Sequence, residues 1–136
     1  MKIMLDKGAK MPTRAFKTDA GLDLYAMEGK FISAKDSETF DTGVHIELPE
    51  GTTGVLKSRS GLMFKHGLTS EGVVDVGFTG SIRVKLFNHS DEPYEVKKGD
   101  KISQLVILPI KILPIEVVDS LDETDRGSNG FGSTGR

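Results

Sequence analysis

Apolar and polar residues alternate along several short stretches of the chain. The segments 22–26, 44–48 and 82–87 each place an apolar residue at every second position. A two-residue period is typical of strands that bury one face. Clusters of Gly, Pro, Asn and Asp separate these segments, so the pattern predicts an all-β fold, a jelly-roll-like barrel or sandwich rather than βαβ units.

Two further segments depart from this alternation. Ser60 is expected to N-cap one short helix that ends at Gly67. The run 102–110 is almost entirely apolar, which predicts a strand buried on both faces or one that a partner subunit covers. A proline then interrupts 111–118, so this segment is expected to be either a last strand or an arm that pairs with a neighbouring chain.

Composition narrows the class of protein. A length of 136 residues suits one domain, placed at 1–118, followed by a flexible arm over 119–136 that has too few apolar residues to build a core. The absence of cysteine excludes disulfides and thiolate metal sites. A net charge of −2 means that no broad basic field points to nucleic acid or an anionic membrane, and no apolar run approaches the ~20 residues of a membrane span. Residues 1–5 resemble a strand rather than a signal peptide, so a cytoplasmic location is expected.

The chain ends in a glycine-rich, cationic segment. Arg126 and Arg136 flank it, and Ser133 and Thr134 add hydroxyl donors. Glycines let successive backbone N–H groups converge on an anion, and Phe131 is a lone aromatic that could stack on a base. The segment is therefore predicted to close over a nucleotide, and a disordered polar tail is the alternative.

A second candidate is the segment 57–62. Arg59 offers fork-shaped donors that suit phosphate, and a helix beginning at Ser60 would add free N–H groups at the same place. An ordinary loop arginine beside a helix cap is an equal alternative.

A carboxylate follows two β-branched residues in the segment 72–80. Val73 and Val74 precede Asp75, and Gly77 and Phe78 follow it, a pattern that predicts a strand entering a tight hairpin. Asp75 could act as the general base on a water molecule. A structural turn aspartate is the alternative.

Two polar residues lie on predicted strands. Asp23 alternates with Leu22 and Leu24, so it faces the opposite side and could hold a water of a magnesium ion; an exposed strand aspartate is the alternative. Gln104 stands at the head of an apolar run, where its amide needs a partner. That partner is either a ligand or a structural hydrogen bond.

Taken in order, these segments resemble the five motifs of the trimeric dUTPase family. The resemblance covers 19–135 and rests on RGSNGFGSTG, RSGL, GVVDVGF and GDKISQL, which are jointly specific although each is weak alone. It implies a jelly-roll-like subunit in a homotrimer, with active sites at subunit interfaces and a C-terminal arm that closes over a neighbour's site. It also implies Mg²⁺-assisted hydrolysis of dUTP to dUMP and pyrophosphate, which limits uracil incorporation into DNA and supplies dUMP for dTMP synthesis.

The resemblance also assigns roles to individual residues. Asp75 is similar to the general base of the family, and Asp23 to the carboxylate that supports hydrated magnesium. The residues implied to bind the triphosphate are Arg59, Ser60, Gly61 and Gln104 in the body, and Arg126, Gly132, Ser133 and Thr134 in the arm. The residues implied to surround the uracil and deoxyribose are Val73, Val74, Phe78, Arg83 and Phe131.

Three residues depart from the family pattern. Phe78 replaces a usual tyrosine, and the ring alone is expected to keep discrimination against ribose. Ser58 replaces a frequent proline and is expected to loosen the loop before Arg59. Asn129 replaces a frequent arm glycine, with little loss expected because Asn tolerates left-handed backbone.

Two other functions remain as alternatives. A dCTP deaminase of the same fold would need a glutamate where this chain has Lys85, so deamination is the weaker alternative. A regulatory or binding role on the same scaffold, with a protein partner, is the other.

Overall fold

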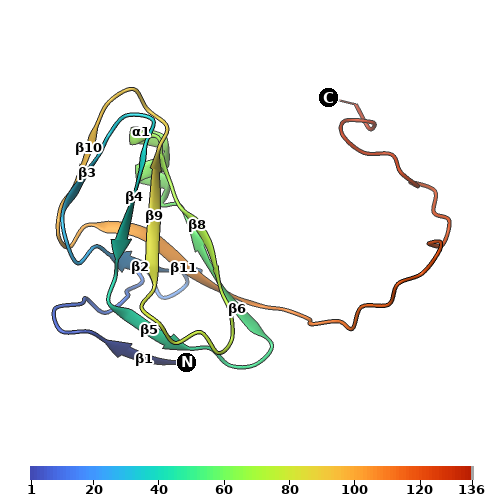
Figure 1. Ribbon diagram of the computed structural model, residues 1–136, viewed down its shortest axis with the longest axis horizontal. Coiled ribbons are helices and arrows are strands. Elements are labelled where there is room, and N and C mark those ends of the chain that lie inside the picture. Colours follow the sequence, from blue (N-terminus) through green and yellow to red (C-terminus); the bar gives the residue numbers. More distant parts are fainter. Residues whose placement is uncertain (136) are drawn as a thin grey trace.

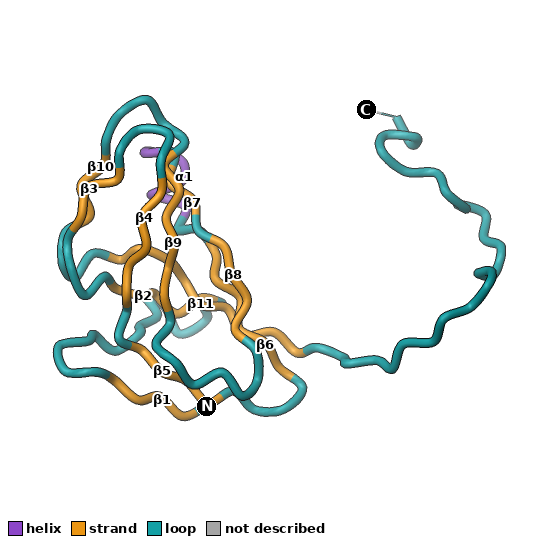
Figure 2. Tube along the Cα trace, viewed as in Figure 1, coloured by secondary structure: helices purple, strands orange, loops and turns teal. Residues whose placement is uncertain are grey.

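The structure, a computed structural model, describes residues 1–135 as strands with one short helix (Figures 1 and 2). In chain order the elements are β1 (Lys2–Leu5), β2 (Gly21–Tyr25), β3 (Lys30–Ile32), β4 (Ser37–Asp41), β5 (Val44–Glu47), β6 (Thr52–Lys57), α1 (Ser60–His66), β7 (Leu68–Thr69), β8 (Glu71–Val74), β9 (Arg83–Asn88), β10 (Tyr94–Val96) and β11 (Lys101–Pro109). The predicted all-β fold with one helix is confirmed.

The strands form four antiparallel groups around one core. A four-stranded sheet has the order β2–β11–β6–β8 and a three-stranded sheet the order β4–β9–β7, while β1 pairs with β5 and β3 with β10. Buried residues from all four groups form one cluster, whose largest members include Phe40, Leu24, Ile32 and Leu105. The sheets therefore enclose a single apolar interior, as a jelly-roll-like subunit does.

Strand β9 shows the predicted alternation directly. Val84 and Leu86 are buried, whereas Arg83, Lys85 and Phe87 face outward. This matches the pleat, which sends successive side chains to opposite faces.

Strand β11 changes character along its length. It lies between β2 and β6, and the neighbouring residues Ile102 and Ser103 are both buried, so both faces are covered at its start. Towards its end Leu108 is exposed, and no strand follows within 110–135. The prediction that this strand is buried on both faces therefore holds for its first half only. For residues 111–118 the prediction of a last strand is wrong in the single chain, because these residues form no strand.

The helix begins one residue earlier than predicted. Arg59 is the extended N-cap residue, with φ −80° and ψ 132°, and its carbonyl accepts the first bond from Met63 N–H at 2.9 Å. Ser60 is thus helical rather than the N-cap, and no side chain caps this end. Gly67 ends the helix in the left-handed conformation, φ 65°, as predicted. Across residues 1–135, no helix is long and apolar enough to cross a membrane.

The predicted hairpin after Val74 is wrong. Strand β8 pairs with β6, and β9 pairs with β4 and β7, so the chain between them passes from the four-stranded to the three-stranded sheet. We call residues 75–82 the crossover segment. A local pattern of strand, turn and strand cannot tell a hairpin from such a crossing, because pairing partners come from elsewhere in the sequence.

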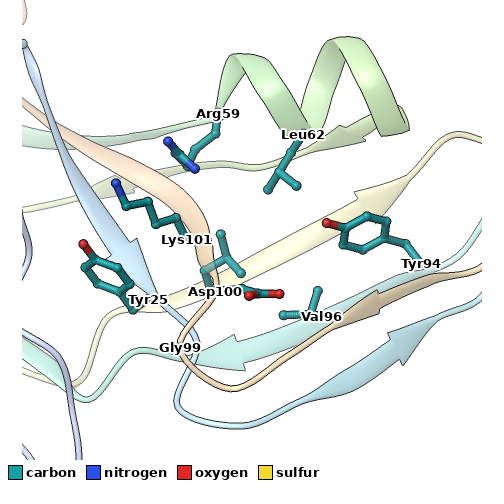
Figure 3. A pocket seen from close by; sticks show the side chains of 9 residues that line it. Tyr25, Arg59, Leu62, Tyr94, Val96, Gly99, Asp100 and Lys101 are labelled. Atoms are coloured by element: carbon teal, nitrogen blue, oxygen red, sulfur yellow. The ribbon is translucent and has the colours of Figure 1, made fainter. Parts of the chain in front are cut away.

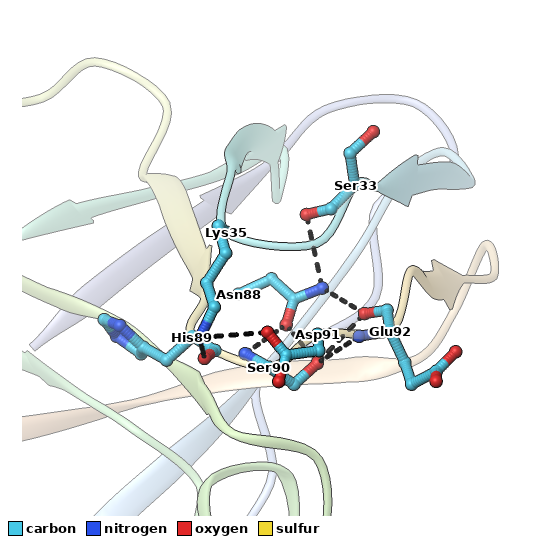
Figure 4. A network of polar contacts seen from close by, with 7 residues as sticks. All are labelled: Ser33, Lys35, Asn88, His89, Ser90, Asp91 and Glu92. Carbon is cyan, nitrogen blue, oxygen red and sulfur yellow. Dashed lines mark hydrogen bonds and ion pairs between the residues drawn. The ribbon is translucent and has the colours of Figure 1, made fainter.

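A polar network fixes the other end of β9 (Figure 4). The buried Asn88 donates to the carbonyl oxygens of Ile32 at 3.2 Å and Glu92 at 2.8 Å, and its own oxygen accepts from Ser90 N–H and Oγ–H at 3.0 and 2.7 Å. Because both the nitrogen and the oxygen of the Asn88 amide have hydrogen-bond partners, this polar side chain can occupy a buried position of the strand where an apolar residue would be expected.

Candidate active site

Three segments bring a carboxylate and two cations together at one place. Asp23 on β2 is 9 % exposed, and its two oxygens lie 3.0 Å from Arg59 Nε and 2.8 Å from Lys101 Nζ. Asp23 is opposite Gln104 in the β2–β11 register. We call these four residues the Asp23 cluster. Asp23 does point away from its neighbouring leucines, but it is buried rather than exposed because the two cations cover it.

The two cations of the cluster face an open cavity that the Asp100 carboxylate also lines (Figure 3). Arg59 and Lys101 line a cavity of about 410 Å³, together with Tyr25, Leu62 and Tyr94. Arg59 uses Nε for Asp23, which leaves its terminal nitrogens free to donate to a second anion. Such an arrangement suits a polyphosphate.

Sequence reasoning missed Lys101. The signal was present, since the lysine of GDKISQL stands two residues before the buried Ser103 at the start of an apolar strand. Only the β2–β11 register, with its irregularity between Lys101 and Ser103, places this ammonium group beside Asp23.

Gln104 makes a structural hydrogen bond and keeps further capacity. Its Nε2 donates to the carbonyl oxygen of Ser58 at 3.0 Å. The side chain lies across Gly21, where an added Cβ would stand 2.1 Å from Oε1 and 3.0 Å from Cβ of Gln104. The amide carries a second N–H beyond the bond to Ser58, so a ligand can still be recognised.

The loop before Arg59 is tied down by the Ser58 side chain. Ser58 Oγ donates to the carbonyl oxygen of Ser70 at 3.1 Å and accepts from Ser70 N–H at 2.9 Å. The hydroxyl of Ser58 thus restrains the loop through two bonds, and the expected loosening relative to proline stays a prediction.

The start of α1 adds backbone donors beside Arg59. The first amides of a helix have no partner within it, and here they belong to Ser60 and Gly61. Nothing lies within 4 Å of the position that a Cβ on Gly61 would occupy. The backbone at this point is thus open to close approach.

The crossover segment carries a second, separate group of candidate residues. Asp75 is exposed directly after the buried Val74, and Phe78 N–H donates to its carbonyl oxygen at 3.2 Å across a turn in which Gly77 has φ 90°. The Phe78 ring lies over Gly80, where an added Cβ would be 2.8 Å from it. Val73 and Phe78 are also exposed, so a carboxylate and two apolar groups share this surface.

Arg83 lies at the far end of the crossover segment. It begins β9 opposite Asp41 of β4 and faces outward. The structure thus keeps Val73, Asp75, Phe78 and Arg83 on one stretch of chain that leaves one sheet and enters the next.

The two groups do not meet within one chain. Gly54 of β6 pairs with Val74, next to Asp75, whereas Lys57 at the other end of the ladder leads to Arg59. Gly54 and Lys57 are three residues apart on β6, about 10 Å at 3.3 Å per residue, and Asp75 and Arg59 lie beyond opposite ends of that stretch. Within one chain the crossover carboxylate and the Asp23 cluster therefore lie towards opposite ends of the β6–β8 ladder.

The arm forms a third group that stays apart from the body (Figure 1). Its hydrogen bonds within the described residues are local turns, such as Arg126 Nε to the carbonyl oxygen of Asn129 at 2.9 Å. Phe131 is fully exposed with φ 51°, and Gly132, Ser133 and Thr134 are exposed beside it. Asn129 itself has no positive φ, and Arg136 lies outside the described residues.

Comparison with known proteins identifies the family. The family model described as dUTPase matches residues 7–135, nearly the whole chain. This chain belongs to the dUTPase family. The predicted resemblance is confirmed, and the motif segments described above lie within the matched region.

Relatives of the dUTPase family match over almost their full length. The deoxyuridine 5'-triphosphate nucleotidohydrolase of Clostridium tetani is 43% identical over 136 residues, covering 98% of this chain and 94% of the relative. That of Kluyveromyces lactis is 45% identical over 130 residues, covering 94% and 88%. The similarity to bacterial and fungal members therefore runs from end to end.

Solved dUTPase structures share the fold. The Staphylococcus bacteriophage 80alpha dUTPase with dUpNHpp superposes with a TM-score of 0.93 at 30% identity, covering 99% of this chain and 98% of that one. A mutant dUTPase from phage phi11 of S. aureus, whose structure concerns the coordination of a structural Mg(II) ion, gives 0.83 at 27% identity, covering 90% and 98%.

The residues around Asp23 constrain how a metal could bind. No group of three or more carboxylate or imidazole ligands occurs in residues 1–135. Magnesium often keeps several waters and uses one or two carboxylates plus substrate phosphates. A lone Asp23 beside a phosphate site fits that mode and does not fit an all-protein cage.

Proposed function

We propose that this chain hydrolyses dUTP to dUMP and pyrophosphate. Membership of the dUTPase family supports the reaction. The observation that carries the assignment of the site is the Asp23 cluster, which sets Arg59 and Lys101 on one buried carboxylate beside an open cavity. Two cations that share one carboxylate keep donors for the oxygens of a triphosphate.

The body of the subunit binds the triphosphate. The terminal nitrogens of Arg59 and the second N–H of Gln104 donate to phosphate oxygens, and the Lys101 ammonium adds charge. The open backbone at Ser60 and Gly61 lets a phosphate approach the amides at the start of α1.

The crossover segment binds the sugar and base. The Phe78 ring packs on the deoxyribose and leaves no space for a 2′-hydroxyl, while backbone groups of Val73 and Val74, with Arg83, line the uracil. This ring lies over Gly80 and carries no hydroxyl, so its discrimination against ribose is steric.

Asp75 acts as the general base in this proposal. It takes a proton from a water molecule whose oxygen attacks the α-phosphorus in line. The bond from the α-phosphorus to the bridging oxygen breaks, that oxygen keeps the electron pair, and pyrophosphate leaves while the water oxygen stays on dUMP. Positioning supplies most of the rate, and a base contributes about 10²–10⁴-fold.

Mg²⁺ is the proposed cofactor. Asp23 would hold it through water, since a carboxylate has about four acceptor positions and Arg59 and Lys101 occupy two. When bound, the ion neutralises triphosphate charge and favours departure of pyrophosphate.

A homotrimer completes the site in this proposal. Because Asp75 and Arg59 lie far apart in one chain, the base acts on a triphosphate held by another subunit. Residues 119–136 form an arm that closes over a neighbour's site, with Arg126, Gly132, Ser133 and Thr134 on the phosphates and Phe131 on the uracil. The apolar residues that precede the arm, including Ile112, Ile115 and Val117, are almost fully exposed and suit burial against another copy.

A subunit-complementation experiment tests this arrangement. Asp75→Asn and Arg59→Ala homo-oligomers should each be inactive, whereas co-refolding them in equal amounts should restore about a quarter of the sites, those that take each intact residue from a different subunit. Sedimentation should give a trimeric mass. A mixture that stays inactive while forming mixed trimers would place both residues in one chain's site.

A direct assay tests the reaction itself. We expect pyrophosphate release from dUTP with Mg²⁺ and little from dCTP, dTTP or UTP. Release of ammonia from dCTP would instead support a deaminase; on β9 the relevant position is the exposed Lys85, which offers no carboxylate. A regulatory protein partner stays a prediction.

A further inference from the structure

Outside the residues already assigned, one histidine holds the crossover segment in place. His45 Nδ1 lies 2.7 Å from the carbonyl oxygen of Thr79, and its Nε2 lies 3.1 Å from Asp6 Oδ1. Thr79 directly follows Phe78 and lies four residues after Asp75. The histidine therefore connects β5 and the turn after β1 to the segment that carries the proposed base.

Few other bonds restrain this part of the chain. In the part of the chain that the structure describes, His45 is the one side chain that hydrogen-bonds to residues 75–80. Before them Val74 is paired in β8, and after them Ser81 is bonded to Asp41 and Ile82 N–H to the carbonyl oxygen of Val44. Val74, paired with Gly54, holds this turn on the Asp75 side, and the Thr79 carbonyl is the first attachment after Phe78 on the other side.

The two partners of His45 fix its protonation state. A backbone carbonyl oxygen and an ionised carboxylate can only accept hydrogen bonds, whereas a neutral imidazole has one donor and one acceptor nitrogen. Both bonds are complete only when the ring carries two N–H groups, that is, as imidazolium. Loss of one proton must break or weaken one of the two contacts.

We propose that His45, as an imidazolium held by Asp6, is a positioning residue that aligns Asp75 and Phe78 through the Thr79 carbonyl. This rests on the proposed role of Asp75 as base. His45 touches no substrate; it sets the place of a turn whose own contacts to the body are few. A misplacement of about 1 Å in a reacting group can cost about 10²-fold in rate.

The two contacts of His45 depend on pH, because they require its imidazole to be protonated. The Thr79 carbonyl first, and then Asp6, raise the pKa of His45 above its ordinary value. Because folding raises this pKa, the paired form is complete below the ordinary pKa of histidine, and the contacts are lost as the pH rises through the raised value. Further charges near the ring are Asp41 on β4 and the Lys2–Glu47 ion pair of 2.9 Å on β1 and β5.

Two substitutions at position 45 separate the effect of the hydrogen bond to the Thr79 carbonyl from the effect of imidazole titration. His45→Ala removes both contacts, whereas His45→Asn places an amide N–H near the position of Nδ1 and cannot titrate. We expect kcat for dUTP to fall about tenfold in His45→Ala with KM within about twofold, because the Asp23 cluster is untouched. His45→Asn should recover most of kcat and lose the alkaline fall of the wild-type profile. Asp6→Asn should move that fall to lower pH.

Controls keep the outcome decisive. His89→Asn makes the same substitution at a histidine bonded to Thr69, at the other end of β9, and should leave the pH profile unchanged. Thermal melting and ¹⁵N imidazole shifts of the wild type report folding and double protonation of His45 independently of turnover. Wild-type kcat in His45→Ala, or an alkaline limb that persists in His45→Asn, would overturn the proposal. Failure of the wild type to release pyrophosphate would instead count against Asp75, and the imidazole shifts would still test the two bonds.

Discussion

The Asp23 cluster and the C-terminal arm contain similar chemistry in opposite physical states. Arg59 and Lys101 are bonded to a buried carboxylate, and the loop before Arg59 is pinned to Ser70. Arg126 and Phe131 lie on an extended segment whose hydrogen bonds within the described residues are local. The difference separates a cluster that the single chain already holds together from an arm that, within the described residues, makes no hydrogen bond to the body.

Between them stands the crossover segment, which is partly restrained. It is anchored at both ends and through His45, yet Asp75 and Phe78 are exposed. The Asp23 cluster is thus held by ion pairs, the crossover segment by its two ends and His45, and the arm by local hydrogen bonds. Perturbing one region at a time should affect turnover, binding and stability in different proportions.

Removal of the base should give the largest effect on turnover. Asp75→Asn keeps the shape of the exposed turn but lowers kcat by about 10²–10⁴-fold, because the amide cannot take the proton of water. Binding of a non-hydrolysable dUTP analogue, measured by calorimetry, should stay within a few-fold. Normal turnover by this variant would show that another group is the base.

Truncation before Arg126 should separate the arm from the body. We expect the melting temperature to be unchanged, because the removed residues contribute nothing to the core. We expect kcat/KM to fall about 10²-fold, because the arm can no longer close over the site. Pyrophosphate release and thermal denaturation measure the two quantities. If full activity survived the truncation, the arm would have no part in the site.

The charge balance of the Asp23 cluster should affect affinity more than the chemical step. Lys101→Met leaves Asp23 with Arg59 alone, so one of the two cations disappears and KM should rise about tenfold, a modest value because both cations are partly exposed. Lys101→Arg should restore most of the loss. Equal KM values for the methionine and arginine variants would remove Lys101 from phosphate binding.

The smallest effect is expected from Gly21→Ala. The new methyl group would meet the Gln104 side chain, which must move away from Ser58 and lose its alignment. We expect a loss of about threefold to tenfold in kcat/KM with a fold that remains intact. Gln104→Ala provides the comparison, since Gly21→Ala in that background should have no further effect.

Local pattern predicted the strands better than their partners. The alternation in 82–87 correctly indicated which side chains of β9 face inward, because the pleat alone decides this. The same kind of pattern around Asp75 suggested a hairpin, and the structure has a crossing between sheets. For Asp23 the predicted face was right, but its burial depends on two cations from distant segments.

Several site features had no local signal. Ser58 was expected to loosen its loop, yet Ser70 lies close enough for its backbone to bond with the Ser58 hydroxyl in both directions. His45 sits in an ordinary alternating strand, and only the path of the crossover segment brings Thr79 to it. Lys101 became a member of the cluster through strand register alone.

By itself the sequence determined the all-β class, the helix end at Gly67, the glycine-rich arm and, through its joint motifs, the dUTPase family. Those features follow from residue spacing, backbone preference and side-chain type, which are local properties. Tertiary structure decided that Asp23 is buried between cations and that Asp75 lies far from Arg59 in one chain. Both depend on which strands pair and in what register, and pairing between distant segments is settled only when the whole core packs.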